Sequence, residues 1–190
     1  MKYQDANQRV AEYRREIAAL REKMRATQAS AESQEVEDYE FAVPGGTHKL
    51  SAFFGGKDTL ILIHNMGTSC PSCTMWADGF NGVYPHLLDR AGFVVTSPDP
   101  PEAQQRFAEA RGWKFPMASH HGTSFAADMG YAREGRMWPG VSVFKLERGK
   151  ILRVADTGFD AGDDFCCVWR LLDLTPEGAA GWRPKFSYAG

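Results

Sequence analysis

Two cysteines separated by two residues are the side chains of this chain best suited to chemistry. They stand in the stretch Cys70-Pro71-Ser72-Cys73, which follows a hydrophobic run by a short loop and opens a helix, with Pro71 at or beside the first helical position. This spacing brings the two sulfurs within reach of a disulfide. A thiol in the first turn of a helix faces unpaired N–H groups and the positive end of the helix dipole, which favour the thiolate. We therefore predict that Cys70 is the exposed attacking thiolate and that Cys73 is the shielded thiol that resolves the mixed disulfide.

Few charged groups surround these cysteines in the sequence. No Lys or Arg occurs between residues 58 and 89, so the helix terminus must provide most of the thiolate stabilisation. His64 is the nearest titratable group that could become a cation. We expect the pKa of Cys70 to be modestly lowered and to stay above about 4.5. The residues that we take as candidate active-site neighbours are His64, Pro71, Ser72, Trp76 and Asp78.

Two other interpretations of the Cys70–Cys73 pair stay open. A metal-binding module would hold zinc or copper(I) between these cysteines and a histidine, although zinc sites usually have a second pair of ligands at similar spacing. The remaining candidates, His120-His121 and Cys166-Cys167, lack that spacing, so we assign no metal ligands. Free cysteines also pack in protein cores, and an inert pair would leave a non-catalytic interaction module.

The adjacent pair Cys166-Cys167 lies in the last predicted helix. Neighbouring cysteines rarely bridge without straining the peptide between them. We expect one of the two to pack in the core and the other to lie near the surface, and the alternative is a second relay thiol.

Composition narrows the class of protein. The chain has 190 residues, a net charge of −2 and 43% hydrophobic residues, which suits one globular domain and argues against a nucleic-acid binder. No apolar stretch is long enough to span a bilayer, and the first residues lack the apolar region of a secretory signal. Four cysteines are too few for a disulfide scaffold. We expect a cytoplasmic protein that binds neither nucleic acid nor membrane.

Strand and helix signals alternate along the body of the chain. The predicted order is β-β-β-α-β-α-β-β-α, an α/β layer fold with helices on both faces of the sheet. The predicted strands are 39–43, 48–54, 60–63, 93–96, 141–146 and 151–155, the last two as an antiparallel hairpin. The predicted helices begin near Cys70 (broken or kinked by Gly79, Gly82 and Pro85), cover 101–111 with a stop at Gly112, and cover 163–174.

Residues 5–30 form a separate amphipathic helix in this interpretation. Apolar residues recur at spacings of three and four, without Gly or Pro, at Val10, Tyr13, Ile17, Leu20 and Met24. We divide the chain into a helical arm (1–35), a domain (36–178) and a C-terminal tail (179–190). The arm packs on its own domain, or it swaps onto a partner subunit and forms a homodimer.

These motifs give the chain a resemblance to a known family. It resembles the thioredoxin-like bacterial family catalogued as domain of unknown function 899, whose members are described as predicted dithiol–disulfide oxidoreductases. The similarity covers nearly the whole chain, in the stretches EDYEF (37–41), LSAFFGGKDTLILIHNM (50–66), CPSCTMWADGFNGVYPHL (70–87), GWKFPMASHHGTSFAADMG (112–130), GVSVF (140–144) and LDLTPEG (172–178). It implies a central mixed sheet flanked by helices, with catalytic roles for Cys70 and Cys73.

The resemblance also suggests where a substrate binds. In thioredoxin-like folds a cis-proline stands before the strand opposite the dithiol, and Pro139 and Gly140 occupy the corresponding place here. Either the bond before Pro139 is cis and Pro139 and Gly140 bind substrate through the backbone, or Pro139 is an ordinary proline at the start of a strand. The segment 97–119 also resembles peroxiredoxins in layout, but the peroxidatic signature P-x-x-x-[TS]-x-x-C requires Thr or Ser where this chain has Gly67, three residues before Cys70.

We therefore predict a thiol–disulfide oxidoreductase, with a thiol peroxidase as an alternative. It would need no organic cofactor, and a protein or a small thiol or disulfide would be its substrate, with a further reductant or oxidant to recharge the pair.

Overall fold

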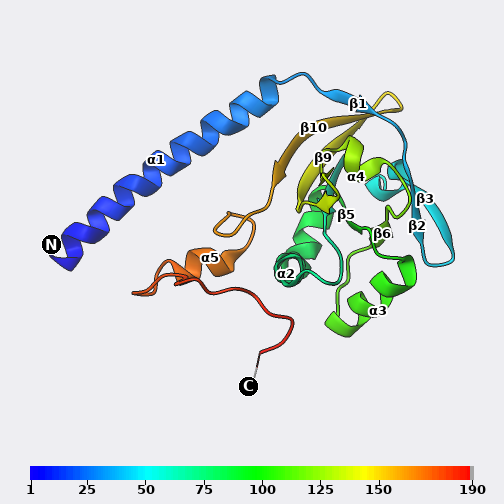
Figure 1. Ribbon diagram of the computed structural model, residues 1–190. Coiled ribbons are helices and arrows are strands. Elements are labelled where there is room, and N and C mark those ends of the chain that lie inside the picture. The colour runs from blue at the N-terminus through cyan, green and yellow to red at the C-terminus, as the bar shows by residue number, and fades with distance from the viewer. Residues whose placement is uncertain (189–190) are drawn as a thin grey trace.

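An eight-stranded mixed sheet forms the centre of the molecule (Figure 1). The computed structural model describes residues 1–188. The strand order in the sheet is β1-β10-β9-β4-β5-β6-β2-β3. The strands are β1 (Gln34–Val36), β2 (Glu40–Val43), β3 (Gly46–Lys49), β4 (Thr59–His64), β5 (Gly92–Ser97), β6 (Met117–Ser119), β9 (Gly140–Glu147) and β10 (Lys150–Gly158), and β7 (Ala132–Arg133) with β8 (Arg136–Met137) forms a small separate ribbon. The helices are α1 (Tyr3–Ser30), the 3₁₀ helix η1 (Leu50–Phe54), α2 (Pro71–Arg90), α3 (Pro101–Arg111), α4 (Phe125–Asp128) and α5 (Cys167–Leu172).

The apolar runs of the sequence form the central strands. β4 and β5 pair in parallel with Ile63 opposite Val95, and β9 joins the other side of β4 in the antiparallel sense. β9 and β10 form the predicted hairpin, whose two turn residues, Arg148 and Gly149, both have positive φ, as a type I′ turn requires.

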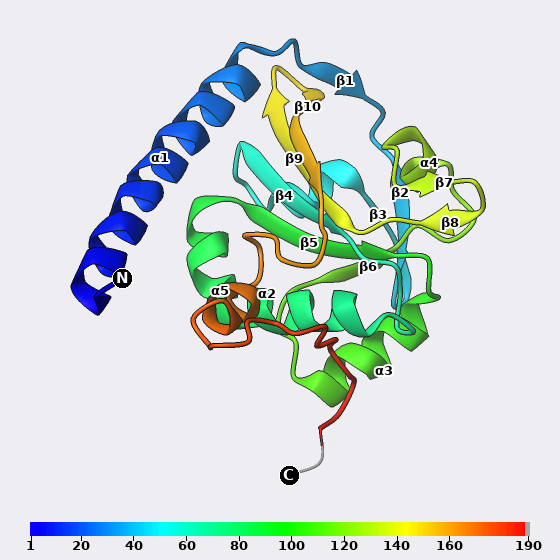
Figure 2. The ribbon, with the colours of Figure 1, turned by 60° about the vertical axis from the view of Figure 1, so that its left-hand side comes forward.

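Each face of the sheet carries its own apolar core, because side chains alternate between the two faces of a strand. One core lies under α2 and includes Ile63, Val95 and Phe80. The other lies against η1 and α4 and includes Leu62, Val94 and further side chains from these two helices. The layout confirms the predicted thioredoxin-like α/β fold with a mixed sheet and flanking helices (Figure 2).

Several predicted boundaries are wrong. The strand predicted over 48–54 ends at Lys49, and η1 replaces the rest and packs Leu50 and Phe54 into the core. Of the break or kink expected in α2, the break is absent, because the helix continues through Pro85. The last helix is only Cys167–Leu172, and β1, β6, α4 and the β7–β8 ribbon were not predicted.

α1 extends along one side of the body as a rod of 28 residues (Figures 1 and 2). None of its residues is buried. Residues 31–33 connect it to β1, which pairs with β10 at the edge of the sheet. The C-terminal tail returns to the body, where Trp182 packs edge-on against Trp169. Within residues 1–188, no helix has the length and apolar character needed to cross a membrane.

Candidate active site

Cys70 and Cys73 meet at the N-terminus of α2, as the sequence predicts. Cys70 is the N-cap residue, and its Sγ accepts a hydrogen bond from the backbone N–H of Cys73 at 3.1 Å. Pro71 is the first helical residue, where its missing N–H costs no hydrogen bond. Both thiols are free. Cys73 is 2% exposed and Cys70 9%, so Cys73 is shielded as expected, but the prediction of an exposed Cys70 is wrong, because the first turn of α2 packs into the core under the sheet.

The two thiols differ in acidity. A hydrogen bond from the Cys73 side chain lowers the pKa of Cys70 to about 7, helped by the backbone N–H groups of Cys73 and Ser72 and opposed by burial. The same hydrogen bond, together with burial and the nearby Cys70 charge, raises the pKa of Cys73 far above its ordinary value. Cys70 is thus the thiolate of the pair, and its modestly lowered pKa agrees with the prediction.

The loop before Cys70 is held by side chains that the sequence analysis missed. Asn65 Oδ1 accepts from the Gly67 N–H at 2.8 Å, and Asp99 Oδ2 accepts from the Thr68 N–H at 2.7 Å. Gly67 has φ of +108°, and a Cβ there would lie 2.8 Å from the Asp99 carboxylate. The topology offered a signal for Asp99, because it follows β5, and the carboxyl ends of parallel β4 and β5 meet at one edge of the sheet.

His64 lies away from the dithiol. Its ring stacks on Tyr131 at 3.7 Å between centroids and packs near Phe125, in the core on the opposite face of the sheet from Cys70. Its Nε2 is 2.9 Å from Ser142 Oγ. Burial lowers the pKa of His64 well below its ordinary value, so it is neutral and supplies no positive charge to the thiolate.

Trp76 and Asp78 connect α2 to other parts of the chain. The indole N–H of Trp76 donates to Asp163 at 3.3 Å, which fixes the segment that leads into α5. Asp78 accepts from Arg111 Nε at 2.9 Å and from the indole N–H of Trp113 at 2.8 Å. The two residues therefore position helices and loops around α2.

Pro139 and Gly140 lie at the start of β9. The described chain contains no cis peptide bond, so the cis-proline hypothesis is wrong and the bond before Pro139 is trans, as most X–Pro bonds are. The Pro139 carbonyl accepts from the Phe159 N–H at 2.9 Å, and Gly140 is paired with His64 on one side and Gly158 on the other. Substrate binding by Pro139 and Gly140 stays a prediction.

A hollow of about 430 Å³ opens beside the dithiol turn. Ser72 and Trp76 of α2 form one wall, and Trp169 and Trp182 form the wall facing them. The hollow places aromatic surface next to the residue between the two cysteines, so it can receive an apolar part of a substrate.

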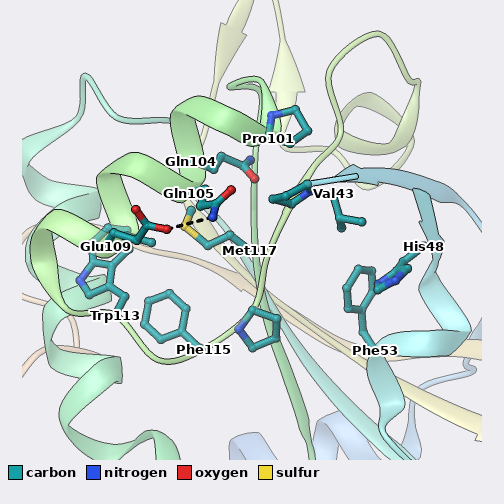
Figure 3. Close-up of a pocket in the computed structure, with 13 residues that line it drawn as sticks. Val43, His48, Phe53, Pro101, Gln104, Gln105, Glu109, Trp113, Phe115 and Met117 are labelled. Atoms are coloured by element: carbon teal, nitrogen blue, oxygen red, sulfur yellow. Dashed lines mark hydrogen bonds between the residues drawn. The ribbon is translucent and has the colours of Figure 1, made fainter. Parts of the chain in front are cut away.

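A separate hollow of about 440 Å³ lies between α3 and the β2–β3 hairpin (Figure 3). Trp113 and Phe115 lie at one end of it, and His48 and Phe53 at the other, with Glu109 on α3 above them. None of the sequence-predicted site residues lines it.

Of the adjacent cysteines Cys166 and Cys167, one is buried and the other is exposed, as predicted. Cys166 is buried in the same core as the dithiol and burial raises its pKa, whereas Cys167 is exposed. His120 is buried, and this burial lowers its pKa. Across residues 1–188, no three His, Cys, Asp or Glu side chains are grouped so that they could hold a metal ion.

One protein-family model matches almost the whole chain. The model of a family of bacterial proteins of unknown function, DUF899, matches residues 1–186. The chain belongs to the DUF899 family. No curated protein sequence matches this DUF899 protein.

Solved structures similar to this DUF899 protein include peroxiredoxins. Peroxidoxin BcpB from Mycobacterium tuberculosis is 25% identical with a TM-score of 0.55, over 64% of this chain and 84% of that one. Peroxiredoxin Q from Xanthomonas campestris is 21% identical with a TM-score of 0.53, over 69% and 87%. Reduced Prx3 from Vibrio vulnificus is 15% identical with a TM-score of 0.54, over 70% and 89%. At these low identities, the comparisons with peroxiredoxin Q and Prx3 show a shared fold and nothing more.

Proposed function

We propose that this DUF899 protein is a thiol–disulfide oxidoreductase that works through Cys70 and Cys73. The observation that carries the proposal is the Cys70 sulfur at the N-terminus of α2, where it accepts the Cys73 N–H and has a pKa of about 7. At pH 7.5 a thiol with this pKa is roughly three quarters thiolate, whereas an ordinary cysteine is mostly protonated.

The exchange takes two steps in the reducing direction. The Cys70 thiolate attacks one sulfur of a substrate disulfide, so that a mixed disulfide forms and the other substrate sulfur leaves as a thiolate that takes a proton from water. Cys73 then loses its proton and attacks the Cys70 sulfur, which releases the second substrate thiol and leaves a Cys70–Cys73 disulfide. A small thiol or a dithiol protein returns the pair to the reduced state, and no organic cofactor takes part.

The surroundings of the pair support these roles. The high pKa of Cys73 keeps it protonated while Cys70 attacks, and the first turn of α2 keeps it within reach for the second step. The aromatic hollow beside Ser72 offers a place for the substrate chain that carries the disulfide. Because Cys70 is nearly covered and its neighbour Ser72 lines this hollow, we propose that the substrate reaches the Cys70 sulfur from the hollow.

A redox titration tests the proposal. The protein is equilibrated in a series of dithiol–disulfide buffers, and its free thiols are then alkylated and counted by mass spectrometry. We expect one reversible two-electron couple assigned to Cys70 and Cys73, lost in Cys70→Ser and kept in the matched control Cys167→Ser. In Cys73→Ser the mixed disulfide should accumulate. A pair that stays reduced under all buffers would refute the proposal.

A thiol peroxidase is the second candidate, because the similar solved structures are peroxiredoxins. The Cys70 thiolate would attack a peroxide, forming a sulfenic acid as the O–O bond breaks and the leaving oxygen takes a proton. Condensation with Cys73 would then form the disulfide and release water. Gly67 argues against an efficient peroxidase, since it supplies no hydroxyl before Cys70 and the Asp99 carboxylate fills the space beside it. Consumption of hydrogen peroxide by the reduced protein distinguishes the two candidates.

A further inference from the structure

Within residues 1–188, the apolar stripe of α1 is left largely uncovered by the rest of the chain. Its residues Val10, Tyr13, Ile17, Leu20 and Met24 are 44–64% exposed along a helix of 28 residues, which makes about eight turns. Helices gain most of their stability from packing an apolar face rather than from propensity. A stripe of this length therefore indicates a packing surface whose partner lies outside the single chain.

The body offers two adjoining apolar hollows near this helix. One, of about 930 Å³, lies between α1 and α5, with Ile17 on one wall and Leu171 and Leu174 on the other. The second, of about 460 Å³, lies over the sheet between α2 and the segment before α5, and Val83 and Val143 are among its lining residues. Both hollows include Asp164 and Cys167, so they form one continuous surface, which we call the docking groove.

Part of the docking groove lies over a face of the sheet that no long helix of the chain covers within residues 1–188. On the face of β4 and β9 beside α2, Ile61, Val141 and Val143 line the second hollow, and α5, with six residues, is too short to cover it. The chain's own α1 does not cover it either. It reaches the groove only as one wall of the first hollow, and none of its residues lines the second.

We propose that α1 of a second copy of this chain lies in the docking groove, and that the two copies form a symmetric dimer by exchanging their arms. Because each groove has its own α1 as one wall, a two-fold axis brings the two arms side by side and fills both grooves with the same contacts. The proposal is independent of the chemistry of the dithiol.

Charge favours this occupant. α1 carries six basic and four acidic side chains, whereas the groove segment 160–173 carries four Asp and one Arg. Within one chain, Arg21 of the arm contacts Asp164 at 2.7 Å, and Arg170 pairs with Asp164 and Asp173. A basic arm therefore has a complementary acidic rim on every copy of the chain.

The buried area is also sufficient. At 1.5 Å per residue α1 is about 42 Å long, and with a width of about 10 Å it covers a footprint of roughly 400 Å². Each of the two arms and each of the two grooves would lose this area of surface, so the dimer would remove about 1,600 Å² of accessible surface from water. This is the size of a standard stable interface.

The oligomeric state of the full chain tests the proposal. By light scattering after size exclusion at micromolar concentration, we expect about twice the chain mass of 21.1 kDa. Ile17→Glu should yield a monomer, while the matched control Ala19→Glu, on the opposite face of the same helix, should stay dimeric. Circular dichroism establishes that both variants are folded.

Two variants on α2 test the groove itself. Val83 and Leu88 are both exposed apolar residues of this helix, but only Val83 lines the groove. We expect Val83→Glu to weaken the dimer at least tenfold and Leu88→Glu to leave it unchanged. Cys167, which lines the groove, should be alkylated severalfold faster in Ile17→Glu than in the native dimer.

Three results would overturn the proposal. A native protein that is a monomer contradicts it, including one whose arm binds vesicles of anionic phospholipid instead. A dimer that survives Ile17→Glu shows that the arm is not the interface. A dimer lost in Ile17→Glu but unaffected by Val83→Glu, with Cys167 alkylated at the same rate, shows that the arms pair only with one another.

Discussion

Replacing Cys73 by Ala should raise the pKa of Cys70. The hydrogen bond from the Cys73 side chain is the largest cause of the low pKa of Cys70. A hydrogen bond to a charged group contributes about 1.5–3 kcal/mol, which corresponds to roughly one to two pKa units. Because the backbone N–H of Cys73 remains in the variant, we expect the pKa of Cys70 to rise from about 7 to about 8–9.

The ultraviolet absorbance of the thiolate measures this change as the reduced protein is titrated with base. Replacing Cys166 and Cys167 by Ala in both the parent and the variant leaves only the thiols of the dithiol motif to titrate. The comparison with Cys73→Ser separates the hydrogen bond from the loss of volume, since Ser can still donate to Cys70. A Cys73→Ala variant whose Cys70 still titrates near pH 7 would refute the reasoning and assign the thiolate to the helix terminus alone.

Three further outcomes follow from the same geometry. Gly67→Ala should lower the free energy of unfolding in urea by about 1–3 kcal/mol, because Gly67 has a φ of +108° and an added Cβ would lie 2.8 Å from the Asp99 carboxylate. The control Gly79→Ala, in open space within α2, should be neutral or stabilising. Asp78→Ala should cost about 1 kcal/mol in the same assay, since it removes a partly exposed ion pair, and the exposed Asp89 should tolerate Ala. Folding lowers the pKa of Cys70 from 9.0 to about 7, so the reduced protein should become more stable as the pH rises from about 7 to about 9. This gain in the free energy of unfolding is lost as the pH falls through 7, and it should be absent in Cys70→Ser.

The strongest local patterns predicted the fold well. The apolar runs of β4 and β5 could only be buried strands, and Pro101 and Gly112 mark the start and stop of α3. The failures occur where tertiary packing overrides local preference. The stretch 50–54 reads as a continuation of a strand, but it folds as η1, which packs Leu50 and Phe54 into the core on the face of the sheet opposite α2.

The candidate site was predicted only in part, for a related reason. The motif Cys70–Cys73 specifies its own helix terminus, because the spacing and Pro71 act within one turn. His64 is close to Cys70 in sequence, yet the alternation of β4 sends its side chain to the other face of the sheet. Asp99 is far away in sequence, and it reaches the loop before Cys70 because β4 and β5 end at the same edge.

The acidity of Cys70 bears on the choice between the two candidate functions. In thiol–disulfide exchange the nucleophilicity of a thiolate falls as its pKa falls, so an attacking thiol works best when its pKa lies near the ambient pH. A pKa of about 7, set mostly by Cys73, meets this condition and needs no cationic side chain. It also links the two thiols, because the hydrogen bond that activates Cys70 is the one that keeps Cys73 protonated. That bond is lost once Cys70 is in a mixed disulfide, so the pKa of Cys73 should fall when its thiolate is required for the second step.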